Sequence, residues 1–126
     1  MRILITGGCG FIGSNLAIFL KGKIKNVKIT SIDNLSRKGS QLNHKRLSRK
    51  GIKNFKINIV DSNKLIKLPK FDLIIHCAAE PAIEVSRKKT EEVFKSNLVG
   101  TFNVLQKCAK DKSNIIYLSS SRVYAI

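Results

Sequence analysis

The sequence has few cysteines, few aromatic residues and no long apolar run, and each absence excludes a class of protein. The three cysteines, Cys9, Cys77 and Cys108, are odd in number and form no C-x-x-C pair, so we expect neither a disulfide framework nor a metal site. The longest apolar runs are too short to span a bilayer, and the first strand-like run begins too close to Met1 for a signal peptide. Both features predict a cytoplasmic protein with no membrane partner.

Acidic residues are also scarce, because 8 Asp and Glu stand against 24 Lys and Arg and give a net charge of +16. Such a charge suits nucleic acid, anionic lipid or an anionic small substrate. The basic residues are spread along the chain, however, and few aromatic residues lie among them for stacking on single strands. We interpret the charge as a solvated lysine-rich surface. A basic nucleic-acid-binding protein is the less favoured alternative, and the densest basic cluster comprises Lys45, Arg46, Arg49 and Lys50.

Strand-like and helical patterns alternate from end to end, without an internal repeat or a linker. Five strands are predicted, at residues 3–5, 27–32, 55–60, 71–78 and 114–118. Helices are predicted after the first strand, at residues 41–50 with Gly51 ending the helix, and at residues 90–110. We therefore predict one domain, residues 1–126, of the α/β class: a Rossmann-type doubly wound parallel sheet in the order 3-2-1-4-5, with right-handed crossovers.

The most informative stretch is TGGCGFIGSNLA, residues 6–17, which directly follows the first strand-like run. It contains Gly8-x-Gly10-x-x-Gly13, and a second spacing that starts at Gly7 overlaps it. The first glycine permits a tight turn, the middle one lets a pyrophosphate approach the backbone, and the last lets the helix pack on the strand. This pattern predicts a dinucleotide site at the N-terminus of the following helix, although a ligand-free strand-turn-helix remains an alternative.

An acidic residue is expected about 20 positions further on, where it would accept hydrogen bonds from the adenosine ribose. Asp33 stands in that position, directly after the second predicted strand. Its charge would repel a 2′-phosphate, which favours NAD over NADP. Arg37 and Lys38 follow closely and could host that phosphate, so NADP remains the alternative to the favoured NAD.

The carboxyl ends of the predicted parallel strands should meet along one rim, where such sheets bind their ligands. There Asp61 could accept from the adenine amino group, small Ala78 and Ala79 would allow close approach of the cofactor, and the serines could reach the nicotinamide or the substrate. Two other polar residues are interpreted conservatively. His76 is predicted to be a satisfied core histidine, and a nucleophilic role for Cys9 is less favoured than burial. The predicted rim comprises residues 7–10, Asp33, Asn34, Asp61, Ser62, Ala78, Ala79 and residues 119–121.

With these residues in place, the chain resembles the extended short-chain dehydrogenase/reductase superfamily, in particular the NAD-dependent nucleotide-sugar epimerases and dehydratases. Within it, the chain looks most like the CDP-tyvelose/CDP-paratose 2-epimerase branch. The matching pieces cover essentially the whole chain: TGGCGFIGSNLA, DNLSRKGS, the Asp61 strand end, HCAAEPA, Asn97-x-x-Gly100-Thr101 and SSSRVY.

The resemblance implies a role for each matching residue, with NAD as cofactor and a nucleotide sugar as substrate. Asn97 would brace the fourth and fifth strands, and Ser120 would be the catalytic residue that hydrogen-bonds the sugar hydroxyl undergoing oxidation. The pyrophosphate would lie on Gly7, Gly10, Phe11, Ile12 and Gly13. The adenosine ribose would meet Asp33 and Asn34, and the adenine side would be lined by Ser36, Arg37, Lys38 and Asp61.

The sequence departs from the family after the fifth strand, because the family's Tyr-x-x-x-Lys base is absent and Tyr124 has no lysine four positions later. Ser121 and Arg122 stand where dehydratases and decarboxylases carry acids, which favours epimerisation. We therefore expect the cofactor half of an epimerase, inactive alone, with an exposed fifth-strand edge. The long helix would take part in a homodimer or in binding a complementing C-terminal half. The alternative is a non-catalytic NAD-binding or interaction module.

Overall fold

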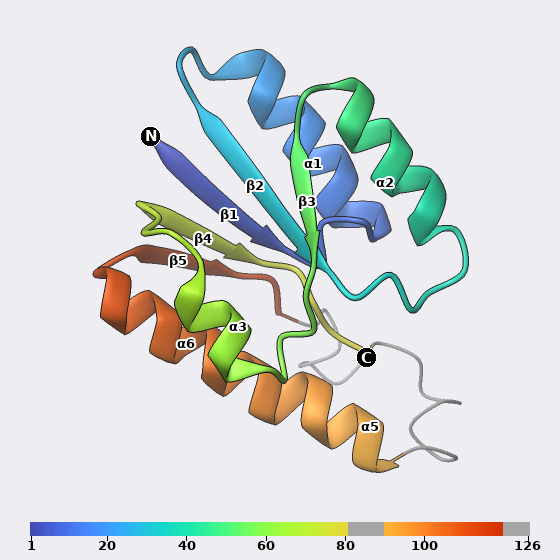
Figure 1. Ribbon diagram of the computed structural model, residues 1–126, viewed down its shortest axis with the longest axis vertical. Coiled ribbons are helices and arrows are strands. Elements are labelled where there is room, and N and C mark those ends of the chain that lie inside the picture. The colour runs from blue at the N-terminus through green and yellow to red at the C-terminus, as the bar shows by residue number, and fades with distance from the viewer. Residues whose placement is uncertain (81–89, 120–126) are drawn as a thin grey trace, which may run out of the picture.

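The computed structural model describes residues 1–80 and 90–119, and a parallel five-stranded sheet lies at its centre (Figure 1). The strand order is β3-β2-β1-β4-β5 and every neighbouring pair is parallel, which confirms the predicted topology. The strands are β1 (Arg2–Thr6), β2 (Lys28–Asp33), β3 (Lys53–Lys56), β4 (Leu73–His76) and β5 (Asn114–Tyr117).

Helices cover both faces of this sheet (Figure 1). α1 (Phe11–Lys23) and α2 (Ser40–Arg49) lie on one face, and α3 (Ser62–Lys67) and α6 (Gly100–Asp111) lie on the other. Successive residues of β1 enter the two cores alternately, since Ile3 and Ile5 pack beneath α1 and α2 whereas Leu4 packs beneath α3 and α6. Burial on both faces explains why the central strands are nearly continuous in apolar residues.

The long helix predicted at residues 90–110 forms, but it contains one wide turn. α5 (Thr90–Phe94) continues through the π-helical turn η1 (Lys95–Val99) into α6. Such π-turns are rare and occur often at functional sites, because the extra residue re-aims the side chains around it. Here the turn contains Asn97, one of the predicted site residues.

The predicted third strand at residues 55–60 is wrong in its bounds, since β3 spans Lys53–Lys56. The backbone turns at Asn58, whose side chain accepts from the Val60 N–H at 3.1 Å and whose carbonyl accepts from the Asp61 N–H at 3.0 Å. Ile59 leaves the sheet and packs into the core beneath α6. The alternation of apolar residues therefore continues past the end of β3, because Ile59 is buried by α6 and not by a neighbouring strand.

Apolar side chains remain exposed on β5 and along the long helix. On β5 and just after it, Ile116, Tyr117 and Leu118 are exposed. Ile116 and Leu118 lie on one face, as expected for a fifth strand with part of one apolar face uncovered, whereas Tyr117 lies on the other. On the helix, a second exposed set recurs every three or four residues, at Phe94, Leu98, Phe102 and Leu105. None of the helices in the described part of the chain is long and apolar enough to cross a membrane.

Candidate dinucleotide-binding site

The turn between β1 and α1 is built from glycines for two different reasons. Gly7 has a φ of +66°, in the left-handed region, and a Cβ on it would lie 2.8 Å from the backbone of Ala78. Gly13 lies on α1 with its Cα turned toward the turn, so a Cβ there would run into the Gly7 carbonyl and would lie 2.8 Å from the Gly8 Cα. The helix therefore lies as close to the strand end as backbone atoms allow.

Gly10 is the N-cap of α1 and is tied to the turn by its own N–H, which donates to the Gly7 carbonyl at 3.0 Å. The Ser14 N–H donates to the carbonyl of this cap residue at 3.1 Å. Because the N-cap is a glycine, no side chain caps the free N–H groups in the first turn of α1, and that turn carries no acidic residue. The helix thus offers backbone donors and its positive dipole end to an anion.

Asp33 lies at the end of β2, half-buried, with its carboxylate against the glycine turn. Its Oδ2 accepts from the Cys9 N–H at 3.0 Å and its Oδ1 accepts from the Leu35 N–H at 2.8 Å. The structure thus brings together the glycine turn and the acidic residue that were identified 20 positions apart. Because each oxygen has more than one lone pair, the carboxylate retains the capacity to accept further hydrogen bonds.

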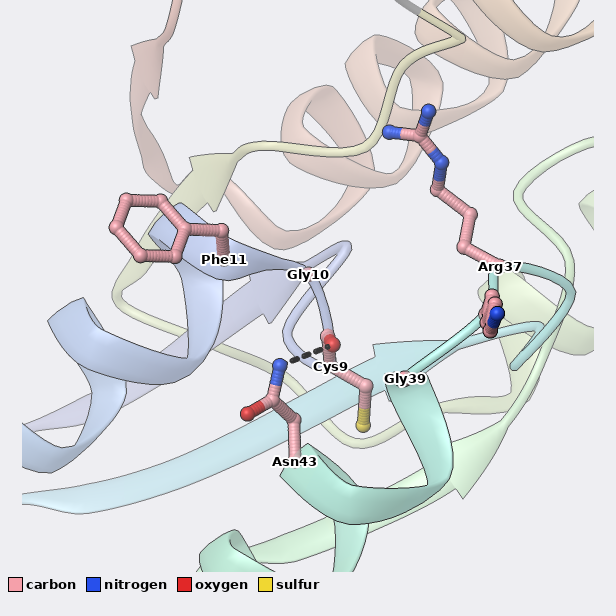
Figure 2. A pocket seen from close by; sticks show the side chains of 7 residues that line it. Cys9, Gly10, Phe11, Arg37, Gly39 and Asn43 are labelled. Carbon is pink, nitrogen blue, oxygen red and sulfur yellow. Dashed lines mark hydrogen bonds between the residues drawn. The ribbon is translucent and has the colours of Figure 1, made fainter.

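A hollow of about 460 Å³ opens beside this turn (Figure 2). Of the residues predicted to line the adenine side, Arg37 and Lys38 face it, whereas Ser36 is hydrogen-bonded to the Asn34 side chain at 2.8 Å. The wall includes two residues that were not predicted as site residues, Gly39 and Asn43, and the Asn43 Nδ2 donates to the Cys9 carbonyl at 2.9 Å (Figure 2). The lining residues are Cys9, Gly10, Phe11, Arg37, Lys38, Gly39 and Asn43.

Asn43 had one recognisable signal, an amide on the first turn of a helix that follows the acidic strand end. Its partner could not be read from the sequence, because Cys9 lies 34 residues away. The contact fixes the orientation of the Cys9 carbonyl and ties α2 to the glycine turn. Phe11 and Ile12, at the start of α1, are both exposed, and their contact with a pyrophosphate stays a prediction.

His76, at the end of β4, is a satisfied core histidine, as predicted. It is 1% exposed; its Nδ1 lies 2.6 Å from the Thr6 hydroxyl and its Nε2 lies 3.0 Å from the Thr101 hydroxyl. The Thr6 hydroxyl also accepts from the Ala78 N–H at 3.2 Å, so the cluster joins β1, β4 and α6 directly beneath the glycine turn. Burial lowers the pKa of His76 from 6.5 to about 4.

This histidine gives a prediction about pH. Because its folded-state pKa lies below the unfolded value, the unfolded chain binds the additional proton between about pH 6.5 and pH 4, and the folded chain loses stability as the pH falls through that window. The loss from this group is at most about 3 kcal/mol. Urea unfolding of the wild type and His76→Gln at pH 7, 5.5 and 4.5 measures it. Equal pH slopes for the two proteins would contradict the assignment.

The segment after β4 is held by the side chain of Asn97. Its Oδ1 accepts from the Glu80 N–H at 2.7 Å and its Nδ2 donates to the Glu80 carbonyl at 3.0 Å. Asn97 therefore ties the segment after β4 to the long helix, and its predicted bracing of the fourth and fifth strands near the cofactor stays a prediction. The backbone of Ala78 lies against Gly7, and its side chain packs against the core beneath α3 and α6, whereas Ala79 is exposed. Whether these alanines admit a cofactor stays a prediction.

Asp61 and Ser62 lie at the start of α3, five residues or more beyond β3. The Asp61 carboxylate caps this helix, since Oδ1 accepts from the Lys64 N–H at 3.1 Å and Oδ2 lies 3.2 Å from the Lys64 ammonium. The hydrogen bonds from Lys64 hold the pKa of Asp61 below its usual value. Asn103 of α6 supports the preceding loop through the Ile59 and Val60 carbonyls, at 3.0 Å each. Contact with adenine stays a prediction.

The three cysteines are free thiols. Burial, with the Asp33 charge added, raises the pKa of Cys9 to about 12, so its thiol stays protonated and a nucleophilic role loses support. Cys108 is buried as expected, but Cys77 is only half-buried because it follows the last ladder residue of β4. Within residues 1–80 and 90–119, His, Cys, Asp and Glu do not gather in a group that could hold a metal ion.

The predicted catalytic residue, Ser120, lies outside the described residues, as do Ser121, Arg122 and Tyr124. Of the predicted serine segment, Ser119 is described and follows β5 at the same edge of the sheet as the glycine turn.

Two curated proteins of similar sequence are named for reactions of nucleotide sugars. The dTDP-D-glucose 4,6-dehydratase of Dictyostelium discoideum is 40% identical over a 129-residue alignment, and the CDP-paratose 2-epimerase of Salmonella typhi is 39% identical over 132 residues. Each alignment covers 98% of this chain but only 30% and 38% of the respective relative. The chain therefore spans about a third of the length of these relatives.

Solved structures give the same picture. The UDP-Glc/GlcNAc 4-epimerase from Campylobacter jejuni superposes with a TM-score of 0.83 at 32% identity, and the UDP-glucose-4-epimerase from Stenotrophomonas maltophila, solved with bound NAD, superposes with 0.86 at 25%. Each match covers 98% of this chain and 38% of the other, corresponding to the N-terminal part of those enzymes. The family described as "NAD dependent epimerase/dehydratase family" matches residues 3–126. With its glycine turn, acidic strand end and sheet order, the chain belongs to the NAD-dependent epimerase/dehydratase family.

Proposed function

We propose that this chain binds NAD as the cofactor portion of a nucleotide-sugar epimerase. One observation carries the proposal: the glycine turn, the N-terminus of α1 and the Asp33 carboxylate converge beside an open hollow. Backbone donors at a helix N-terminus suit a pyrophosphate, and a carboxylate at the end of the second strand suits ribose hydroxyls.

The residues present fit this cofactor. A Cβ on Gly10 would have one protein neighbour within 4 Å, the Gly7 carbonyl oxygen at 3.1 Å, so the fold crowds this position less than it crowds Gly7 or Gly13 and leaves room for a ligand to approach the backbone. Gly7, Gly10, Phe11, Ile12 and Gly13 would hold the pyrophosphate, and Asp33 with Asn34 would hold the ribose. Bound NAD would supply a hydride acceptor for a sugar hydroxyl. The chain's part is to orient the cofactor and, through Ser120, to hydrogen-bond that hydroxyl.

The reaction class is the finer part of the proposal, since relatives named as a dehydratase, a decarboxylase and an epimerase show 40%, 37% and 39% identity. Epimerisation is favoured by Ser121 and Arg122, which lack the carboxylates that the resemblance associates with elimination and decarboxylation. The substrate class is a nucleotide sugar, as the names of these relatives indicate.

The exposed apolar residues of the long helix, Phe94, Leu98, Phe102 and Leu105, are the proposed contact surface for a homodimer or a complementing C-terminal half. A downstream reading frame that begins with a Tyr-x-x-x-Lys helix would favour the complementing half. A catalytically silent NAD-binding module would have no such neighbour.

Calorimetry with NAD and NADP tests the cofactor proposal. We expect the wild type to bind NAD, and Gly10→Val to keep its fold but lose affinity by about 10- to 100-fold, because the added methyl groups displace a charged ligand from the backbone donors. Circular dichroism of both proteins controls for folding. A folded wild type that binds neither cofactor would refute the proposal, and steeply salt-dependent DNA binding in its place would favour the nucleic-acid alternative.

A further inference from the structure

We propose that Glu80 is a positioning residue that holds the Arg37 side chain across the glycine turn, where a dinucleotide would lie. The inference rests on the proposed NAD binding and goes beyond it, because it assigns a role to an acidic residue at the site of an anionic ligand. The two side chains form an ion pair, with Arg37 Nη2 lying 3.6 Å from Glu80 Oε1.

The pair crosses the site from one side to the other. β1 lies between β2 and β4 in the sheet, so the segments that follow β2 and β4 flank the glycine turn that follows β1. Arg37 belongs to the first segment and Glu80 to the second. Figure 2 shows the Arg37 side chain reaching away from Cys9 and Asn43 and toward the segment after β4. The ion pair therefore spans the topological switch point, where a dinucleotide would lie.

Glu80 is the fixed end of this pair. Asn97 holds both its N–H and its carbonyl, at 2.7 and 3.0 Å, from the π-helical turn η1. The Glu80 side chain is 24% exposed, whereas that of Arg37 is 54% exposed. An arginine that is half in solvent loses considerable rotamer entropy when it is ordered. A carboxylate anchored from the long helix can restrict that freedom before the ligand arrives, and such preorganisation strengthens binding.

The charge of Glu80 allows a test, because two explanations of its role predict opposite changes in NAD affinity when the charge is removed. A carboxylate that acted only through its own field would repel the phosphates, so its removal would tighten NAD binding. If the carboxylate acts by orienting Arg37, its removal would weaken NAD binding. The contacts to Asn97 use the backbone of Glu80, so a side-chain substitution leaves them in place.

The experiment is calorimetric NAD titration of the 126-residue chain, the variants Glu80→Gln and Arg37→Gln, and the double variant. We expect Glu80→Gln to weaken NAD binding by about 2- to 5-fold, the range of exposed ion pairs, with an unchanged unfolding midpoint. In the Arg37→Gln background the same substitution should have no further effect, because its route to the ligand is gone. The matched control is Glu91→Gln, which makes the same charge change on exposed α5 and should leave NAD affinity unaltered.

Three results would overturn the inference. Unchanged or tighter NAD binding by Glu80→Gln would show that the carboxylate does not position Arg37. A weakening that persists in the Arg37→Gln background would show that Glu80 acts through another contact. A folded wild type that binds no NAD would overturn the proposed function and this inference together, whereas the first two results leave the proposed function standing.

Discussion

Gly13→Val is expected to abolish folding of the chain, or to leave it largely unfolded at 25 °C. The added Cβ would run into the Gly7 carbonyl and would lie 2.8 Å from the Gly8 Cα, and both are backbone atoms of a turn fixed between β1 and α1. The conflict can be relieved only by moving α1 off the sheet, which would open the core around Ala17. We expect a loss of at least about 4 kcal/mol, comparable to the whole stability of many domains.

The control for this variant lies on the same helix. A Cβ on Gly22 would meet nothing within 4 Å, so Gly22→Ala should stabilise the chain by about 0.5–1 kcal/mol through helix propensity. Urea unfolding followed by far-ultraviolet circular dichroism measures both variants. A Gly13→Val protein with a wild-type urea midpoint would show that α1 does not pack on the turn as described.

Asp111→Ala is expected to cost about 3–5 kcal/mol, because it leaves a buried ammonium without its counter-charge. Lys107 is 1% exposed, and its Nζ lies 2.7 Å from Asp111 Oδ1. The ammonium also donates to the Leu68 and Pro69 carbonyls at 3.0 and 3.1 Å, and Asp111 Oδ2 accepts from the Phe71 N–H at 3.1 Å. The pair thus fastens the loop before β4 to α6. Asp111→Asn should cost less, since it keeps an acceptor for the Phe71 N–H.

The control for the Lys107–Asp111 ion pair is an exposed ion pair with the same four-residue spacing. Lys95 and Glu91 lie four residues apart, 2.6 Å between their charged atoms, with side chains that are 54% and 77% exposed. Glu91→Ala should leave the urea midpoint unchanged within error, because water replaces the lost partner. Equal destabilisation by Asp111→Ala and Glu91→Ala would contradict the burial of Lys107.

Local pattern was sufficient to predict the sheet order and the glycine turn. The spacing from Gly13 to Asp33 predicted that the acid would meet the turn, and the Asp33–Cys9 hydrogen bond is that meeting. The pattern failed at the third strand, because Ile59 alternates like a strand residue but is buried by a helix. The helix α3 was not predicted, since six residues are too few to show a helical period.

The sequence by itself determined the fold class, the family and the place of the candidate dinucleotide site, since these follow from short-range spacing of glycines, apolar residues and one aspartate. Only the tertiary structure decided which of several residues of the same type form the contacts on which the predictions depend. Lys107 is one of several lysines near the end of α6, and Glu80 is one of eight acids, yet each is singled out by contacts with residues 38 to 43 positions away. Side chains so distant in sequence meet through the packing of the sheet against its helices, and no local pattern encodes that meeting.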